Sequence, residues 1–312
     1  MYKNKVLVTG GAGFIGSFLV KRLIKNGHHV TILDDLSTGN IANLKDLPKE
    51  NYDFVKGNIL DEKILDECTN SIDYVFHLAA ICSVQETIRD PIHSFRVNSL
   101  GTLNVLKASL NNAVKKVIFS SSCAVYGDTT DIPINENTTT NPMTPYAVQK
   151  RVSEDYCLLF NENLGLETTC LRYFNVYGPN QNADSEYSAV IPKFIDLISN
   201  NKRPTIFGDG SQTRDFIFVE DIVDANIFAL GKESTGLKIN IGSGESVKIN
   251  EIVSNINEIL QMDIEPNYKD KRAGDILHSR ANISLANEIM NFRPIYNLKS
   301  GLFNTITYNS GV

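Results

Sequence analysis

Two side chains able to transfer a proton, Tyr146 and Lys150, lie four residues apart in a segment with a helical pattern. On a helix this spacing puts both side chains on one face. A phenol has a pKa near 10, but a neighbouring ammonium group stabilises the phenolate. Ser120-Ser121-Ser122 end an apolar run typical of a core strand, the place where parallel sheets bind ligands. Tyr-x-x-x-Lys alone also occurs on exposed helices, so the serines carry the prediction of a proton-transfer site.

A glycine-rich segment follows the apolar run at residues 5–9 and precedes a helical pattern at 14–23. Its spacing is G-x-x-G-x-x-G, and without side chains the backbone N–H groups can approach a pyrophosphate. A plain glycine-rich turn is the alternative, but the strand before it and the helix after it favour a dinucleotide-binding turn. The expected contacts are Gly10, Gly13, Phe14, Ile15 and Gly16.

An aspartate, Asp34, ends the second expected strand, where its carboxylate can accept the ribose hydroxyls of a dinucleotide and repel a 2′-phosphate. No Arg or Lys follows before Lys45, which favours NAD over NADP. The alternative is that Asp34 only caps the following loop. Asn58 and Ile59 follow the third strand, and we expect them near the adenine.

Apolar runs of strand length alternate with helical patterns as far as about residue 174. Continuous apolar strands between amphipathic helices indicate an α/β fold with a doubly wound parallel sheet of the Rossmann type. The expected strands are 5–9, 30–33, 54–55, 74–78, 116–120 and 168–174, and the expected helices include 14–23, 97–110 and 145–164.

The pattern becomes shorter and less regular beyond about residue 175, where prolines and a Gly-Asp-Gly turn interrupt it. This indicates a second, smaller mixed α/β domain for the substrate. We expect a dinucleotide-binding domain of residues 1–175 with a returning segment at about 217–243. The substrate domain then consists of residues 176–216 and 244–312.

The composition excludes several classes of protein. With 42% hydrophobic and 21% charged residues the chain is an ordinary globular one, and its net charge of −6 speaks against a nucleic-acid partner. No apolar stretch is long enough for a membrane span, and we expect a cytoplasmic protein. The five cysteines have no C-x-x-C spacing, so we predict neither a disulfide framework nor a metal site.

Nine segments together resemble the motifs of the extended short-chain dehydrogenase/reductases, in the nucleotide-sugar epimerase/dehydratase family. In this family the chain is most similar to UDP-hexose 4-epimerases. The segments span almost the whole chain in the family's order. They are residues 9–17, 34–39, 77–80, 98–102, 120–127, 146–150, 172–179, 208–221 and 272–279.

The resemblance implies a role for each matching residue. Tyr146 would be the base, Lys150 its supporting cation and a ligand of the nicotinamide ribose, and Ser122 the active-site hydroxyl. The further NAD contacts that it implies are Leu78, Ala79, Ala80, Asn98 and Tyr173. The implied contacts of a UDP-sugar are Asn175, Arg214 and Arg272 on the diphosphate, Phe207 on the uracil, and Ser83 on the sugar. For each arginine a surface ion pair is the alternative, and for Phe207 a place in the core.

The two residues after Ser122 help to choose the reaction. Family members that eliminate water or carbon dioxide resemble one another in carrying acidic residues there, whereas this chain has Cys123 and Ala124. We therefore expect oxidation at C4 to a 4-keto sugar that rotates and is reduced on its other face, which inverts C4 and regenerates NAD. The alternatives are a dehydratase or another extended short-chain reductase, and a non-catalytic NAD-binding sensor.

A small residue, Ser279, occupies the position that gates substrate width in the 4-epimerases that the chain resembles. The resemblance therefore implies UDP-N-acetylglucosamine and UDP-N-acetylgalactosamine as substrates, with UDP-glucose and UDP-galactose also accepted. It further implies a homodimer formed by the helices at about 95–112 and 145–164. The alternative is that the apolar faces of these helices are wholly internal.

Overall fold

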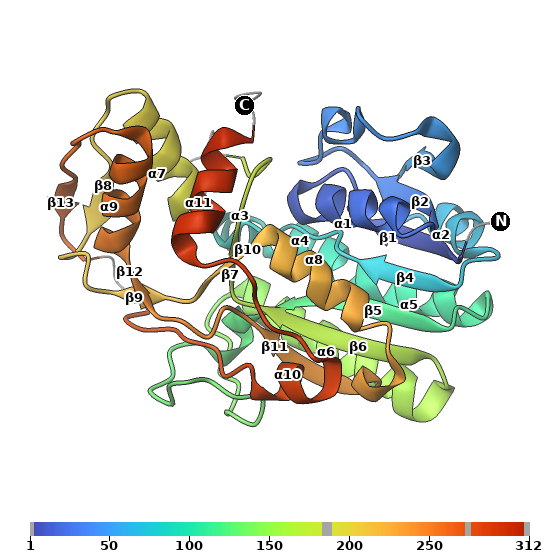
Figure 1. Ribbon diagram of the computed structural model, residues 1–312. Helices are drawn as coiled ribbons and strands as arrows, with labels where there is room; N and C mark the ends of the chain where they lie inside the picture. The colour runs from blue at the N-terminus through green and yellow to red at the C-terminus, as the bar shows by residue number, and fades with distance from the viewer. Residues whose placement is uncertain (1–2, 183–188, 272–275, 309–312) are drawn as a thin grey trace.

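A parallel sheet of seven strands forms the centre of the computed structural model, which describes residues 3–182, 189–271 and 276–308 (Figure 1). Every neighbouring pair of strands in this sheet is parallel, and the order reverses between β1 and β4. The doubly wound fold expected from the sequence is thereby confirmed. In spatial order the strands are β11 (Leu237–Ile241), β6 (Glu167–Tyr173), β5 (Lys116–Ser122), β4 (Tyr74–His77), β1 (Lys5–Thr9), β2 (His29–Asp34) and β3 (Tyr52–Lys56).

Helices cover both faces of the sheet because successive side chains of each strand point to opposite sides. In β1, Val6 and Val8 belong to the core on one side, and Leu7 belongs to the core on the other. The first core contains α1 (Phe14–Lys25) and α8 (Val219–Phe228), and the second contains α2 (Glu62–Thr69), α5 (Gly101–Asn111) and α6 (Pro145–Leu164).

The helix expected over residues 97–110 is interrupted at its start. Short helices α3 (Val84–Arg89) and α4 (Pro91–Phe95) lead into a π-helical turn at Arg96–Leu100, and the regular helix α5 begins only at Gly101. A Cβ atom on residue 101 would lie 2.5 Å from Ile59 Cδ1, so a larger residue there would have to displace the Ile59 side chain. Apolar spacing does not distinguish a π-turn from an α-helix, which is why the sequence predicts a continuous helix.

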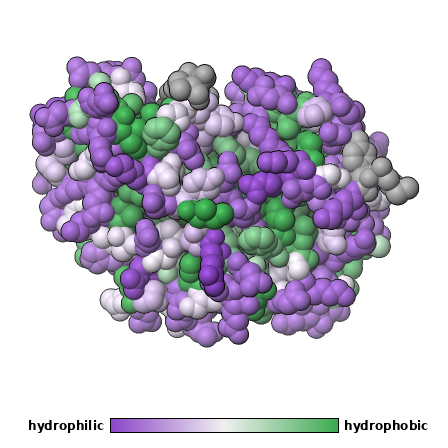
Figure 2. Space-filling model, viewed as in Figure 1, coloured by the Kyte–Doolittle hydropathy of each residue, from purple (hydrophilic) through white to green (hydrophobic). Residues whose placement is uncertain are grey.

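Further elements lie outside the sheet, most of them toward the left of Figure 1, with α10 at the bottom beside β11. They are the pairs β7 (Asn175–Tyr177) with β10 (Phe216–Phe218), β8 (Thr205–Phe207) with β13 (Asn267–Lys269), and β9 (Thr213–Arg214) with β12 (Val247–Lys248), and the helices α7 (Val190–Ser199), α9 (Ile249–Leu260), α10 (Ser284–Met290) and α11 (Leu298–Thr307). In the same view, the surface is mainly hydrophilic with smaller hydrophobic patches (Figure 2).

The five cysteines are all free, and Cys68, Cys157 and Cys170 are buried. Within the described ranges, no helix is long and apolar enough to span a membrane.

Candidate active site

Helix α6 starts at the carboxyl end of β5 and brings Tyr146 and Lys150 to the three serines. Thr144 caps the helix by accepting a hydrogen bond from the Ala147 N–H (3.2 Å), and Pro145 occupies the first turn. One turn beyond Tyr146, the buried Lys150 donates from Nζ to the Ser120 carbonyl oxygen at 2.7 Å. Its Nζ lies 5.8 Å from the centre of the Tyr146 ring. The spacing in the sequence therefore corresponds to one cluster in space.

Burial favours the neutral forms of both side chains. It raises the pKa of the Tyr146 phenol, and the Cys82 and Cys123 thiols add to the effect, while a hydrogen bond with Ser122 works against it. Burial also lowers the pKa of Lys150. A phenolate at this position therefore needs a further positive charge beside the ring, of the kind that an oxidised nicotinamide carries.

A chain of hydrogen bonds crosses the sheet edge at His77. The Thr102 hydroxyl donates to the Asn98 carbonyl oxygen (2.6 Å) and lies 3.0 Å from His77 Nε2, so Nε2 must be the donor to it. His77 Nδ1, 2.7 Å from the Thr9 hydroxyl, is then the acceptor. Burial lowers the pKa of His77 to about 3, which agrees with this neutral tautomer. His77 fixes the end of β4 rather than exchanging protons with a ligand.

The glycine-rich turn is packed so closely that two of its positions leave no room for a side chain. Gly10 has φ +70°, and a Cβ atom there would lie 2.8 Å from the Ala79 backbone nitrogen. A Cβ atom on Gly16 would collide with the Gly10 carbonyl oxygen. Gly13 caps α1 without a side-chain hydrogen bond, and the first turn has no acidic residue. The amino end of α1, at Phe14, can therefore accept an anion.

Asp34 ties this turn to the loop after β2. Its Oδ2 accepts from the Ala12 N–H and its Oδ1 from the Leu36 N–H, both at 2.9 Å. Burial raises the pKa of Asp34, and these two hydrogen bonds counteract the rise. The bond to Leu36 shows that Asp34 does cap the following loop, which is the alternative role considered from the sequence. Each carboxylate oxygen still keeps a lone pair that can accept a hydrogen bond from a ribose hydroxyl.

The other residues expected at the dinucleotide fall into two groups. Asn58 donates from its amide to Asp35 Oδ2 at 2.8 Å, beside Asp34, whereas the Ile59 side chain is buried in the core. Leu78, Ala79 and Ala80 are half-buried and follow β4, next to the glycine-rich turn.

Three further residues that are expected to contact NAD or the sugar already form hydrogen bonds within the protein. The buried Asn98 side chain accepts from the Ile81 N–H (2.8 Å) and donates to Gln149 Oε1 (2.7 Å) on α6. Tyr173 OH lies 3.1 Å from Ser120 Oγ. Ser83 caps α3 through a bond from the Glu86 N–H at 3.2 Å. These contacts give Asn98 and Ser83 structural roles that their spacing in the sequence does not reveal.

Three of the residues that are expected to contact the substrate, Asn175, Phe207 and Arg214, lie on the short strands β7, β8 and β9. Asn175 donates from Nδ2 to the Asp215 carbonyl oxygen at 3.0 Å, and Arg214 donates to the Thr213 carbonyl oxygen at 2.9 Å. The backbone N–H of the buried Ser279 donates to that same Thr213 oxygen at 3.2 Å, which puts Ser279 beside Arg214. The half-buried Phe207 ends β8. Arg272 lies outside the described residues.

A buried aspartate, Asp215, holds this region together and is missed by sequence reasoning. Its carboxylate is fully buried and accepts four hydrogen bonds from two other segments of the chain. The donors are the Ser243 N–H and hydroxyl (both 2.7 Å), the Gly244 N–H (3.0 Å) and the Ala281 N–H (2.9 Å). Burial raises its pKa against the opposing effect of these bonds. An acid directly before the apolar strand β10 is the signal that could have identified it.

Comparison with known proteins places this arrangement in context. The model of the family described as "NAD dependent epimerase/dehydratase family" matches residues 6–242. A solved structure of UDP-N-acetylglucosamine 4-epimerase from Methanobrevibacter ruminantium M1, in complex with UDP-N-acetylmuramic acid, is 42% identical, covers 100% of both chains and has a TM-score of 0.95. The UDP-glucose 4-epimerase of Mycolicibacterium smegmatis is 35% identical over 97% of this chain and 98% of its own. A UDP-N-acetyl-alpha-D-glucosaminuronate decarboxylase of Bacillus cytotoxicus is 36% identical over 98% of both.

Proposed function

Because the chain belongs to the NAD-dependent epimerase/dehydratase family, we propose that it inverts C4 of a UDP-hexose through a transient 4-keto sugar. The observation that carries this proposal is the cluster of Tyr146, Lys150 and Ser122 at the same sheet edge as the glycine-rich turn. No carboxylic acid follows Ser122. The next residue is Cys123, and burial raises the pKa of its thiol to about 12, so it is a poor proton donor to a leaving hydroxyl.

Each residue of the cluster has a task in this reaction. Tyr146 takes the proton from the C4 hydroxyl and later returns it, and Ser122 hydrogen-bonds to the same sugar oxygen. Lys150, held by the Ser120 carbonyl oxygen, stabilises the phenolate. Bound NAD supplies the oxidation and reduction at C4.

The residues at the glycine-rich turn fit NAD. The N–H groups of the turn and of the first turn of α1 would bind the pyrophosphate, and Asp34 would bind the adenosine ribose and exclude a 2′-phosphate. We therefore propose that the purified protein carries NAD, and mass spectrometry of the cofactor released on denaturation tests this. NADP as the main species would contradict the role of Asp34.

The division into a domain of residues 1–175 with 217–243 and a domain of the remaining residues belongs to the same proposal.

The substrate assignment is supported by Ser279 and by a relative. Asn175, Arg214 and Arg272 would bind the diphosphate, Phe207 would stack on the uracil, and the small Ser279 would leave room for an N-acetyl group. The Methanobrevibacter ruminantium protein, 42% identical, is named a UDP-N-acetylglucosamine 4-epimerase. UDP-N-acetylglucosamine and its C4 epimer are thus the preferred proposed substrates, and UDP-glucose and UDP-galactose the second pair.

Decarboxylation is the competing reaction, because the Bacillus cytotoxicus relative is 36% identical and is named a decarboxylase. NMR of the products formed without added NAD separates the two. We expect UDP-N-acetylgalactosamine from UDP-N-acetylglucosamine, formed about a hundredfold or more slowly by the Tyr146→Phe variant. Turnover of UDP-N-acetylglucosaminuronate to a pentose, with the hexoses untouched, would contradict the proposal. No turnover with bound NAD would favour the sensor alternative.

A homodimer is also part of the proposal. Large apolar side chains are exposed on α4 and on neighbouring α6, among them Ile92 (70%), Phe95 (51%), Val148 (45%) and Leu159 (45%). A second copy that covers this surface would remove them from water. Light scattering of the purified protein should give twice the chain mass, and a monomer would contradict the proposal. A cytoplasmic location stays a prediction.

A further inference from the structure

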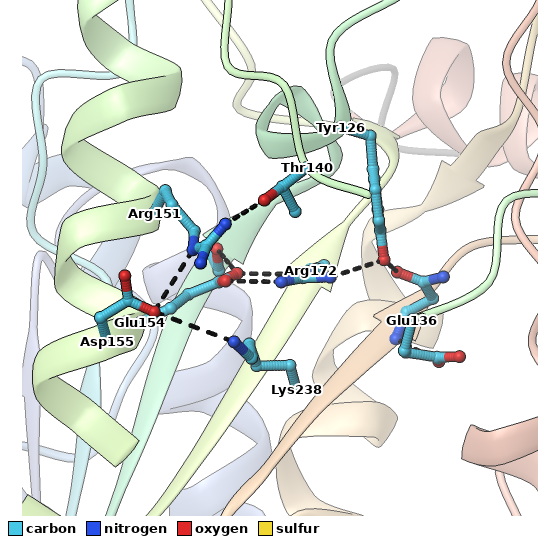
Figure 3. Close-up of polar contacts among 10 residues, drawn as sticks. Tyr126, Glu136, Thr140, Arg151, Glu154, Asp155, Arg172 and Lys238 are labelled. Atoms are coloured by element: carbon cyan, nitrogen blue, oxygen red, sulfur yellow. Dashed lines mark hydrogen bonds and ion pairs between the residues drawn. The ribbon is translucent and has the colours of Figure 1, made fainter. Parts of the chain in front are cut away.

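A buried ion pair lies directly beneath the cluster of Tyr146 and Lys150. Glu154 is one helical turn beyond Lys150 on α6, and both it and Arg172 on β6 are buried completely or nearly so. Arg172 donates two parallel bonds to the carboxylate, Nε to Oε1 at 2.8 Å and Nη2 to Oε2 at 2.7 Å (Figure 3). Replacing such a pair with apolar side chains often leaves stability unchanged or raises it. Stability alone therefore does not account for the pair.

The carboxylate has a third partner that connects it to the active site. Ser121 donates from its hydroxyl to Glu154 Oε1 at 2.6 Å. Its two neighbours in the strand also contact α6, because the Ser120 carbonyl oxygen accepts from Lys150 and Ser122 bonds to Tyr146. Three successive residues of β5 are thus each joined to α6.

The other side of the ion pair is also fixed. Arg172 donates from Nη1 to Tyr126 OH at 2.8 Å (Figure 3), and Tyr126 OH donates to Asn240 Oδ1 at 2.7 Å. Tyr126 belongs to the turn that directly follows Ser122, and Asn240 belongs to β11. The Asn240 amide donates to the Ile134 carbonyl oxygen at 2.9 Å. Glu154 therefore cannot swing away without breaking contacts with several elements.

A second set of charges on α6 provides a contrast. Arg151 pairs with Asp155 at 3.3 Å and also contacts Thr140, and Lys238 lies 3.9 Å from Asp155 (Figure 3). These side chains are partly exposed, and exposed ion pairs contribute little. Of these two sets of charges, only the pair of Glu154 and Arg172 is buried, has two parallel hydrogen bonds and also bonds to a serine of β5.

We propose that Glu154 and Ser121 are positioning residues that set the distance between α6 and the end of β5, and with it the distance between Tyr146 and Ser122. The inference rests on the proposed function, because both hydroxyls must there meet at one sugar oxygen. A displacement of about 1 Å between reacting groups can lower a rate by roughly a hundredfold. Loss of the bond from Ser121 removes the middle of the three contacts and lets α6 shift.

The first test compares the Ser121→Ala variant with a matched control, Thr168→Val. Thr168 is also buried and also bonds to α6, because its hydroxyl donates to the Cys157 carbonyl oxygen at 2.8 Å. It lies near the amino end of β6, away from the serines at the carboxyl end of β5. We expect Ser121→Ala to lower kcat roughly tenfold and to leave the KM for UDP-N-acetylglucosamine within about twofold. Ser121→Thr, which keeps the hydroxyl, should restore kcat, and Thr168→Val should leave it unchanged even if it lowers the melting temperature.

The second test does not depend on turnover. The ultraviolet absorbance of the Tyr146 phenolate can be titrated in the NAD-loaded protein, with the trace of a matching Tyr146→Phe variant subtracted. Lys150, Cys82 and Cys123 face this phenol in every variant. The pKa of Tyr146 should be higher in Ser121→Ala than in the wild type or Thr168→Val, because the phenolate loses aligned partners.

The two tests also separate this inference from the proposed function. A wild-type protein that epimerises no UDP-sugar overturns the proposed function, and the phenol titration still tests the positioning role. Unchanged kcat and an unchanged Tyr146 titration in Ser121→Ala would show that the bond to Glu154 is merely structural. Equal losses in Ser121→Ala and Thr168→Val would lead to the same conclusion.

Discussion

The edge of the seven-stranded sheet and the short-strand region beside it hold their polar groups differently. At the sheet edge, Tyr146 and Lys150 belong to the 20-residue helix α6, which contacts the seven-residue strand β5. In the short-strand region, Arg214 and Phe207 belong to strands of two and three residues and are half-buried. One buried carboxylate, Asp215, ties that region's segments together.

This difference matches two requirements of the proposed reaction. Proton transfer needs atoms in fixed positions, which long elements and buried hydrogen bonds provide. A sugar that must present either face needs room to turn, so its binding energy has to come from the nucleotide end. Under the proposed function, the residues at the sheet edge would therefore set the rate, and those of the short-strand region would set substrate binding and specificity.

The largest expected effect follows from removing the phenol oxygen. Tyr146→Phe should lower kcat by about a hundredfold or more, because the proton acceptor is lost, while NAD stays bound. Steady-state kinetics and the released cofactor check both statements. Near-normal turnover would mean that Tyr146 is not the base.

A smaller effect is expected at the short strands from Ser279→Tyr. The added ring would occupy the space needed by an N-acetyl group, and the kcat/KM ratio of UDP-N-acetylglucosamine to UDP-glucose should fall by about tenfold or more. The ratio cancels a general folding defect. An unchanged ratio would show that Ser279 does not limit substrate width.

The Asp215→Asn variant should change substrate binding in the short-strand region without changing the rate that the sheet edge sets. Its amide directs N–H groups at backbone N–H donors, so the free energy of unfolding should fall by about 1–3 kcal/mol. We expect the KM for the UDP-sugar to rise roughly fivefold, because the segments that Asp215 holds would be less firmly fixed, and kcat to stay within about twofold. NAD retention is the control, and a loss of NAD together with kcat would contradict the separation.

The smallest effect concerns His77 at the sheet edge. Its pKa is lowered to about 3 by burial, so the unfolded chain binds a proton below about pH 6.5 that the folded protein does not. Its contribution to stability is complete above pH 6.5 and is lost as the pH falls toward 3. Between pH 6.5 and 5.5 the wild type should lose about 1 kcal/mol more unfolding free energy than His77→Gln, measured by urea denaturation. Equal losses would indicate a protonated or exposed His77.

The sequence predicts the sheet well because apolar strands buried on both faces leave a continuous local pattern, as in residues 5–9. Tyr146, Lys150 and the serines come together as predicted because the carboxyl ends of parallel strands share one edge. The contacts of Glu154, Arg172 and Asp215 could not be predicted, because a charged residue on a helix or near a turn usually faces solvent. Their burial depends on partners 18 to 66 residues away.

The direct return of hydrogen to C4 is the central chemical claim, and a UDP-N-acetylglucosamine deuterated at C4 tests it. We expect the epimer to form without added NAD and to keep the deuterium at C4, because the hydrogen leaves and returns within one bound complex while Tyr146 exchanges only the hydroxyl proton. NMR and mass spectrometry of the product measure this. Deuterium lost to water from C4 would contradict the account.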